Sequence, residues 1–280
     1  MSIKSKIGRY VRRRMGVVLG GRLAPTRYRG FKFYIDLGDG VISWRLLLGF
    51  GFEEKSKDLI LRLVKKGDVI FDIGANIGDY SLPLSAAVGS GGAVFAYEPV
   101  RRAFRVLAKN IEANRIGNVR VNEIAVGDVD GRCEIYCDSS NFGGNSLMAE
   151  ATTDRGATLN VPITRLDTVC AANQIVPDLV KVDVQGAELR VLAGAVKLLC
   201  NDRTVFWLEY WPAGLAAFGG SVREFCAFAF RNERAVYTID GDVLVSINQA
   251  NLEVLAMSVG YVDILSVPKG WFERRNIALG

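Results

Sequence analysis

The chain of 280 residues contains no histidine, so it has neither a histidine base nor a histidine metal ligand. Its five cysteines form no Cys-x-x-Cys pair, which also argues against a zinc site, and their odd number favours reduced thiols. No apolar run approaches the ~20 residues that span a bilayer. Residues 17–21 are too short and too glycine-rich for a signal-peptide core. We therefore expect a protein retained in the cytoplasm.

Acidic residues are missing from residues 1–35, which carry ten Lys or Arg; the remaining chain has 25 basic and 30 acidic residues. The formal net charge of +5 thus comes from the N-terminal segment. We expect residues 1–50 to form a basic extension and residues 51–280 one folded domain, because half of the chain is apolar and suffices for one core. Nucleic acid is not expected as a partner, since the basic segment lacks interleaved aromatics and the body is acidic.

Residues 68–80 place a carboxylate and two spaced glycines at the end of an apolar strand, in the order Asp72, Gly74, Asn76, Gly78. A dinucleotide fingerprint reads Gly-x-Gly-x-x-Gly, so this spacing is wrong for a pyrophosphate. The carboxylate of Asp72 suits a cationic ligand group, such as the amino-acid end of S-adenosylmethionine, and the glycines allow close backbone approach. An ordinary tight turn between strand and helix is the alternative.

A second apolar run, residues 93–97, ends in Glu98 and Pro99 about twenty residues past the turn, where such sheets place a carboxylate for ribose hydroxyls. Strand and helix patterns then alternate to the C-terminus. The expected later strands are 119–126, 178–183, 204–210 and a closing antiparallel pair, 235–247 and 261–267. This alternation predicts an α/β fold with a doubly wound, mostly parallel sheet. Its ligand crevice would lie at the carboxyl ends of the strands, where Asp72, Glu98, Asp183 and Glu209 all fall.

Residues 127–165 interrupt the alternation with two expected strands, 131–137 and 159–165, around a Ser/Asn/Gly-rich loop. Such an insertion is either a surface hairpin or a lid that binds an acceptor. In the second case Asn141, Asn145 and Ser146 would hydrogen-bond sugar hydroxyls. Near the fifth strand, Trp211, Trp207 and Tyr210 either stack on a sugar face or belong to the core.

Several ordered motifs together resemble the FkbM family of S-adenosylmethionine-dependent methyltransferases. They are Phe52-Glu53-Glu54, the segment 67–78, Glu98-Pro99, the segment 181–188 and Leu192-x-Gly194-Ala. The resemblance covers roughly residues 50–270. It implies the class I methyltransferase fold (Rossmann-like) and methyl transfer to a hydroxyl oxygen of a sugar, glycolipid or natural product. The family commonly has Glu where this chain has Gln185, so a second carboxylate beside Asp183 is absent.

On this interpretation the cofactor is S-adenosylmethionine. Its expected contacts are Asp72, Gly74, Asn76 and Gly78 for the methionine end, Glu98 for the ribose, Glu123 to Ala125 for the adenine, and the adjoining Tyr80 and Pro99. Without histidine, the proton of the acceptor hydroxyl must go to another group, and Asp183 is the first candidate, followed by Glu209 and Glu188. Glu188 is alternatively a first-turn acid that favours its helix. Asp183 and Glu209 could also share a Mg²⁺ ion.

Two other classes of protein stay open. A nicotinamide-dependent oxidoreductase would share the sheet and the Glu98 carboxylate, but the glycine spacing and the lack of a His or Tyr-x-x-x-Lys catalytic pair argue against it. A non-catalytic interaction module that keeps the fold is the other alternative, and the presence of Asp72, Gly78 and Glu98 argues against that.

Within residues 1–20, apolar side chains recur at helical spacing beside the cations. This pattern predicts a basic amphipathic helix that either rests on an anionic membrane surface or packs onto the domain. If it binds membranes, deletion of residues 1–20 will reduce sedimentation of the protein with anionic liposomes. Neutral liposomes are the control, and unchanged sedimentation of the truncated chain would contradict membrane binding.

Overall fold

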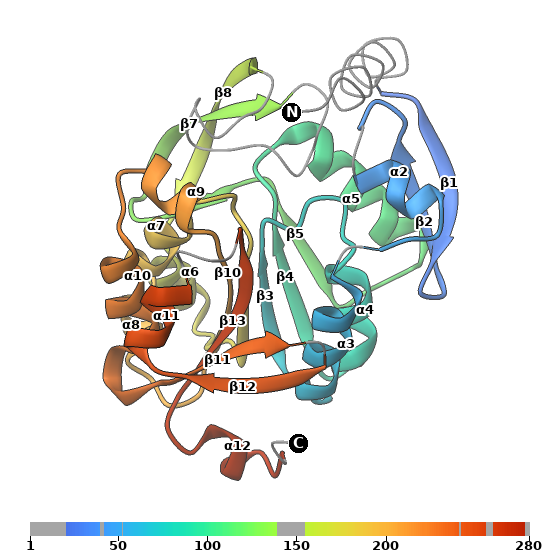
Figure 1. Ribbon diagram of the computed structural model, residues 1–280. Helices are drawn as coiled ribbons and strands as arrows, with labels where there is room; N and C mark the ends of the chain where they lie inside the picture. The colour runs from blue at the N-terminus through green and yellow to red at the C-terminus, as the bar shows by residue number, and fades with distance from the viewer. Residues whose placement is uncertain are drawn as a thin grey trace.

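The computed structural model describes residues 21–39, 42–51, 53–138, 155–240, 242–255 and 260–277. Within those ranges no helix combines the length and the apolar character needed to cross a membrane. An open, twisted sheet runs through the middle of the molecule, with helices on both sides (Figure 1).

In the described residues this central sheet has eight strands in the order β12-β11-β13-β10-β9-β3-β4-β5. The strands are β3 (Val69–Ile73), β4 (Ala93–Tyr97), β5 (Val119–Asn122), β9 (Leu179–Val182), β10 (Val205–Tyr210), β11 (Ala235–Asp240), β12 (Val243–Ile247) and β13 (Val262–Val267). Neighbours from β5 to β10 are parallel, whereas β13 runs antiparallel between β10 and β11. The predicted doubly wound, mostly parallel sheet with an antiparallel strand near the C-terminus is confirmed.

The order of strands reverses next to β3. From β3 the chain builds outward to β4 and β5, and it later returns to place β9 on the other side of β3. Ile73 at the end of β3 therefore neighbours Tyr97 of β4 and Val182 of β9. In open α/β sheets, ligands bind at such a switch point, beyond the carboxyl ends of the strands.

Helices cover both faces of the sheet (Figure 1). One face carries α3 (Glu54–Leu63), α4 (Ser81–Val88), α5 (Arg101–Ala113) and α12 (Trp271–Arg274); the other carries α6 (Leu166–Asn173), α7 (Glu188–Ala193), α8 (Val196–Leu199), α9 (Pro212–Ala217), α10 (Val222–Ala229) and α11 (Gln249–Leu255). Strand side chains alternate between the faces: Phe71 and Ile73 pack toward α6–α11, and Ile70 packs toward α3 and α4. Asp72 thus points to the α3 and α4 face.

The part of residues 1–50 that the structure describes packs against the rest of the chain. An antiparallel hairpin of β1 (Leu23–Tyr28) and β2 (Phe31–Asp36) is followed by α2 (Ile42–Leu47). Phe33 and Ile35 of β2 are fully buried in one cluster with side chains of α5. The Asn110 side chain of α5 bonds the backbone N–H and C=O of Tyr34 and also the C=O of Ile77. The helix expected within residues 1–20 lies outside the described residues.

Three expected elements are divided, and each division is a correction. The strand over 119–126 ends at Asn122, and β6 (Ala125–Val126) joins a separate sheet with β7 (Gly131–Asp138) and β8 (Arg155–Thr164), because the chain leaves the central sheet at its carboxyl edge. The sequence after Glu188 predicts one helix over residues 188–199, but α7 ends at Ala193, before Gly194, and the chain resumes a helix as α8. The strand over 235–247 is the β11–β12 hairpin, since Gly241-Asp242 is a turn signal.

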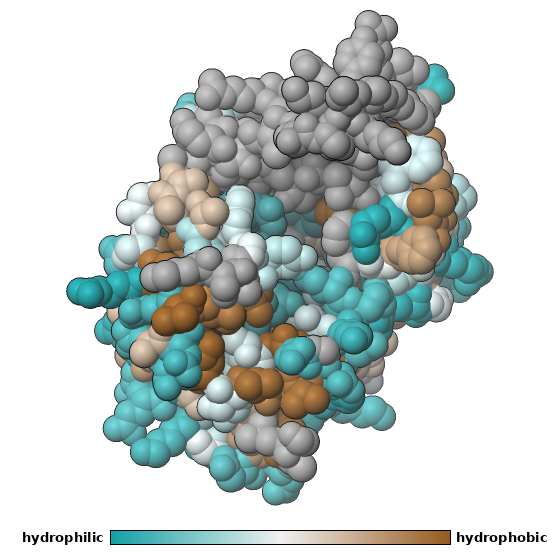
Figure 2. Space-filling view, viewed as in Figure 1, coloured by the Kyte–Doolittle hydropathy of each residue, from teal (hydrophilic) through white to brown (hydrophobic). Residues whose placement is uncertain are grey.

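The expected strand pair in the 127–165 insertion is present as the antiparallel β7 and β8. The loop that joins them, with Asn141, Asn145 and Ser146, lies outside the described residues. On the face seen in Figure 2, exposed apolar residues form separate patches among polar ones. Leu48, Phe50 and Tyr261 are among the large hydrophobic side chains that are more than half exposed in the described chain.

Gly194 permits a close contact between the end of α7 and the segment after β6. A Cβ atom at this position would overlap the carbonyl oxygen of Gly127. We expect Gly194→Ala to lower the free energy of unfolding by about 1–3 kcal/mol because the backbones must separate, with a melting temperature about 2–4 °C lower per kcal/mol. Gly117→Ala is the matched control, since no atom lies within 4 Å of its added Cβ. Equal melting temperatures of the two variants would contradict this account.

Candidate active site

The turn between β3 and α4 brings the two sides of the crevice together. Gly74 has φ +79°, and a Cβ atom there would overlap the carbonyl oxygen of Asp183, which follows β9. The N–H of Asp183 in turn donates to the C=O of Ile73 at 3.1 Å. Gly78, with φ +94°, instead makes room for Leu107 and Leu82, so it serves helix packing. Of the two glycines, Gly74 is therefore the one that sets the crevice.

Glu98 holds this turn from the neighbouring strand. Its carboxylate accepts the N–H of Asn76 at 3.0 Å and that of Val100 at 2.9 Å. Burial raises the pKa of Glu98 to about 7, against the lowering effect of these two hydrogen bonds. Asn76 has φ +49°, and its side-chain Oδ1 is a buried acceptor without a hydrogen-bond partner among the described residues. The turn thus offers an acceptor to a ligand with an N–H or O–H donor.

Asp72 and Tyr80 are more enclosed than a direct ligand contact requires. The Asp72 carboxylate is fully buried, accepts the Ser81 hydroxyl at 2.6 Å and lies 3.7 Å from Nζ of Lys181. The centroid of the Tyr80 ring lies 4.4 Å from Nζ of Lys57 and 4.5 Å from Nζ of Lys181. Both residues therefore support the glycine turn.

Lys181 joins the two sides of the site. Its Nζ also lies 3.4 Å from Oδ2 of Asp183. Burial by itself would lower the pKa of Lys181, but the carboxylates of Asp183 and Asp72 raise it above its usual value. Lys181 is therefore a buried cation at neutral pH.

Beyond Asp183, three further carboxyl groups gather at the ends of β10 and β13 and before α3. Glu209 of β10 and Asp263 of β13 are directly paired across the two strands. Burial raises the pKa of Glu209 to about 10, and the nearby Asp183 is the next largest cause. Burial likewise raises the pKa of Glu53 to about 7, with Asp263 and Asp183 adding to it. At neutral pH we therefore expect Glu209 to hold a proton.

The segment between β9 and α7 is closed by Glu188. Its buried carboxylate accepts the N–H groups of Val184 and Gly186 at 3.1 and 3.2 Å. Gly186, with φ +99°, lies so close to α9 that a Cβ atom would come within 2.9 Å of the carbonyl group of Gly214. Glu188 is thus occupied in shaping the turn, which favours the structural interpretation over catalysis. Gln185, between Val184 and Gly186, adopts the left-handed conformation with φ +54°.

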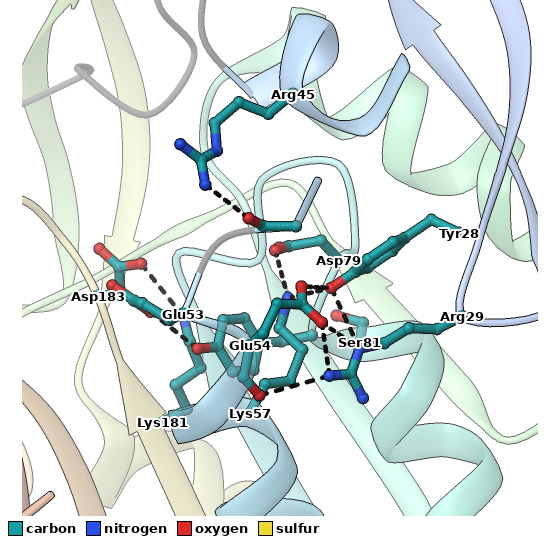
Figure 3. A network of polar contacts seen from close by, with 12 residues as sticks. Tyr28, Arg29, Arg45, Glu53, Glu54, Lys57, Asp79, Ser81, Lys181 and Asp183 are labelled. Carbon is teal, nitrogen blue, oxygen red and sulfur yellow. Dashed lines mark hydrogen bonds and ion pairs between the residues drawn. The ribbon is translucent and has the colours of Figure 1, made fainter. Parts of the chain in front are cut away.

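A polar network fixes the start of α3 and with it Glu53 (Figure 3). Nζ of Lys57 contacts Asp79 of the glycine turn at 2.9 Å and the hydroxyl of Tyr28 at 3.3 Å. Tyr28 also bonds Glu54, which pairs with Arg29. Glu53 itself has φ +48° and accepts the hydroxyl of Tyr80 at 2.8 Å. The β1–β2 hairpin, α3 and the glycine turn thus form one support.

Sequence reasoning missed the roles of Glu53, Lys57, Lys181 and Asp263. Glu53 and Lys181 do stand in the motifs Phe52-Glu53-Glu54 and Lys181-Val-Asp183, which were the available signals. Asp263 carried none, because its partner Glu209 is 54 positions earlier in the chain and only strand pairing joins them.

The aromatic residues in and just after β10 do not form an open surface on which a sugar could stack. Trp207 and Tyr210 are buried in the core, which is the second of the two expectations. The ring of Trp211 packs against Gly214 of α9. Tyr261 is more than half exposed. Its partial burial raises the pKa of its hydroxyl, and the nearby carboxylates of Glu53 and Glu209 raise it further. Of these aromatics, Tyr261 is thus the exposed one beside the carboxyl groups.

The other residues that we expected to contact the cofactor, Glu123, Ala125 and Pro99, lie in different places. Glu123 lies just after β5 and is 3.8 Å from Arg101, whereas Ala125 is buried in the small sheet. Pro99 is half-buried between β4 and α5. Within the described ranges, no group of three or more His, Cys, Asp or Glu side chains is arranged to hold a metal ion, so the expected Mg²⁺ gains no support there.

The strand order, the acid-bearing glycine turn and the carboxylate after the next strand define a class I methyltransferase fold. The sequence matches the Methyltransferase FkbM domain over residues 72–239, which is more than half of the chain. The protein therefore belongs to the FkbM methyltransferase family.

Two curated relatives illustrate the range of this similarity. One is 31-O-demethyl-FK506 methyltransferase FkbM of Streptomyces tacrolimicus, 30% identical over 159 residues, which are 47% of this chain and 60% of the relative. The other is hexuronic acid methyltransferase AglP of Haloferax volcanii, 26% identical over 202 residues, which are 71% of this chain and 80% of the relative. The chain thus spans less than two thirds of the first relative and four fifths of the second.

Among solved structures, methyltransferase FkbM from Methylobacillus flagellatus aligns with a TM-score of 0.45 at 13% identity, covering 71% of this chain and 43% of that one. TYW2 of M. jannaschii in complex with AdoMet aligns with a TM-score of 0.43 at 12% identity, covering 87% and 84%.

We expect Glu98→Ala to weaken S-adenosylhomocysteine binding by about 1–3 kcal/mol, because it removes a charged hydrogen-bond acceptor and frees the N–H of Asn76. Isothermal titration calorimetry measures the change, and circular dichroism checks that the chain stays folded. Glu112→Ala, an exposed acid on the adjacent α5, should bind like the unmodified protein. If Glu98→Ala also binds unchanged, the ribose lies elsewhere.

Proposed function

We propose that the protein is an S-adenosylmethionine-dependent O-methyltransferase whose acceptor is a hydroxyl group of a sugar, glycolipid or natural product. The observation that carries this proposal is the direct contact between the glycine turn and the Asp183 backbone, through Gly74. A cofactor held by the turn would reach the crevice edge where Asp183, Glu209 and Glu53 gather. Cofactor and acceptor sites are thereby adjacent, as an in-line displacement requires.

The residues of the turn fit the proposed cofactor. The unpartnered Oδ1 of Asn76 is a suitable acceptor for the ammonium group of its methionine end. Glu98 would hold the ribose hydroxyls, and Glu123 lies beyond β5 on the adenine side. When bound, S-adenosylmethionine supplies the electrophilic methyl group on its sulfonium. The carboxylates around the crevice favour such a cation over a neutral or anionic ligand.

Asp183 is the proposed proton acceptor for the reacting hydroxyl. Its two oxygens are oriented by Lys181 and Gln185, yet a carboxylate has about four acceptor positions, so an acceptor hydroxyl can still bind. Glu209 is poorly suited to the same task, since its raised pKa of about 10 keeps it protonated at neutral pH. We propose that Glu209 instead donates a hydrogen bond to the acceptor.

The acceptor class rests on the relatives and on the rim of the crevice. AglP is named for a hexuronic acid and the Streptomyces relative for 31-O-demethyl-FK506, so a hydroxyl-bearing sugar and a natural product are both represented. Tyr261 takes the stacking role that the sequence suggested for Trp211, because Tyr261 is exposed beside Glu53 and Glu209. Asn145 and Ser146 remain proposed acceptor contacts from the insertion.

The first test is a thermal-shift titration with S-adenosylmethionine, S-adenosylhomocysteine and the nicotinamide dinucleotides. A melting temperature that rises with the concentration of the two sulfur compounds alone supports the proposal. A rise with a dinucleotide alone would favour the oxidoreductase alternative, and no rise with any ligand would favour the non-catalytic module.

The second test uses radiolabelled S-adenosylmethionine with a panel of hexose and hexuronate acceptors and 31-O-demethyl-FK506. On an acceptor that the unmodified protein methylates, Asp183→Asn should lower kcat roughly 10²–10⁴-fold, because the group that takes the proton is lost. The affinity for S-adenosylhomocysteine should stay within about twofold. Asp202→Asn, an exposed site after α8, is the control. A kcat of Asp183→Asn close to that of the control would remove Asp183 from this role. Activity that survives exhaustive chelation would likewise remove Mg²⁺.

A further inference from the structure

Gln185 joins two strands of the sheet through its side-chain amide. Its Nε2 lies 2.9 Å from Oδ1 of Asp183, which follows β9, and 3.3 Å from Oε2 of Glu209 in β10. An amide nitrogen carries two hydrogens, so it can donate to both carboxyl groups at once. The opposite orientation would place the amide oxygen against the carboxylate of Asp183, which is unfavourable.

The backbone of Gln185 is held in the position that makes this bridge. Its φ of +54° is uncommon for a residue with a long side chain. The conformation is retained because Glu188 binds the N–H groups on both sides of Gln185, at Val184 and Gly186, and because Gly186 packs on Gly214. Strained backbone that the surroundings hold in place is typical of functional sites.

We propose that Gln185 is a positioning residue, whose amide ties Asp183 to Glu209 and thereby fixes the direction in which Asp183 faces an acceptor hydroxyl. The proposal rests on the proposed function, in which Asp183 takes the proton. Gln185 itself transfers no proton. The amide of Gln185 is also an uncharged hydrogen-bond donor, whereas a glutamate at this position would add negative charge.

The charges around this bridge come from several elements. Lys181 precedes Asp183 on β9, Asp72 faces Lys181 from β3, and Glu188 approaches from α7. Glu53, before α3, and Asp263 of β13 also act on Glu209, and the phenol of Tyr261 lies near them. Four of these six groups are carboxyl groups. A further negative charge at position 185 is therefore expected to favour protonated forms throughout the cluster.

The test compares Gln185→Glu, which has the same shape but adds a charge, with Gln185→Met, which removes the donor without a charge. With an acceptor from the panel above, the midpoint of the acidic limb of the kcat–pH profile should move upward by about one pH unit in Gln185→Glu. Gln185→Met should lower kcat with a smaller movement of the midpoint. S-adenosylhomocysteine affinity should stay within about twofold in both, because the amide faces the acceptor side.

Gln174→Glu is the matched control. Gln174 has nearly the same backbone conformation, with φ +55°, and is exposed at the end of α6. Its replacement adds the same charge outside the cluster and should leave the profile unchanged. If Gln185→Glu and Gln185→Met lower the melting temperature but leave the pH midpoint at that of the control, Gln185 only closes the turn and the proposal is overturned.

A second measurement needs no acceptor. Glu53 and Glu209, with pKa values of about 7 and about 10, bind protons more tightly in the folded than in the unfolded protein. The stabilisation that these two groups contribute is thus fully present below their usual pKa of 4.5 and is lost as pH rises through those values. Gln185→Glu should steepen the fall of melting temperature between pH 6 and 9 by about 2–4 °C relative to Gln174→Glu.

If the melting temperatures of Gln185→Glu and Gln174→Glu fall equally between pH 6 and 9, the proposed role of Gln185 is overturned, even if no acceptor is found. Failure of S-adenosylhomocysteine to stabilise the unmodified protein would count instead against the proposed function. The two failures are therefore distinguishable.

Discussion

The ammonium group of Lys181 is the interaction on which the site depends. It is buried between Asp72, under the glycine turn, and Asp183, at the end of β9, and it lies over the ring of Tyr80. Without this cation, the fully buried carboxylate of Asp72 would have no ion-pair partner among the described residues, a strongly unfavourable arrangement. Because parallel pairing aligns Lys181 with Asp72, one lysine can serve both strands.

A second buried cation supports the same turn. Lys57 of α3 lies over the ring of Tyr80 and pairs with Asp79 of the glycine turn. Through Tyr28, Lys57 also connects the N-terminal hairpin to the crevice. The turn that would carry the cofactor is thus supported by elements that begin 50 residues before it in the sequence. The hairpin also shares an apolar cluster with β4 and α5.

The carboxyl groups of Asp183 and Glu209 determine how charge is balanced in the proposed reaction. Methyl transfer from a sulfonium removes one positive charge, and the acceptor hydroxyl releases one proton. If Asp183 takes up that proton, the net charge of the crevice stays constant through the reaction. Glu209, already protonated through burial and its neighbours, contributes a donor without adding charge. The crowding of acids is therefore compatible with a cationic ligand and a neutral, hydroxyl-bearing acceptor.

Local sequence predicted the parts of this molecule that depend on periodicity and turn chemistry. Apolar runs predicted β3, β4, β9 and β10, and the acids at or just after their last residues marked the carboxyl edge, because parallel strands end at one edge of a sheet. Only the tertiary structure decided which of these acids meet: Glu209 pairs with Asp263 across strands, Glu53 arrives from the turn before α3, and Gln185 joins β9 to β10. Their protonation depends on burial and on neighbours distant in the chain, which residue spacing does not encode.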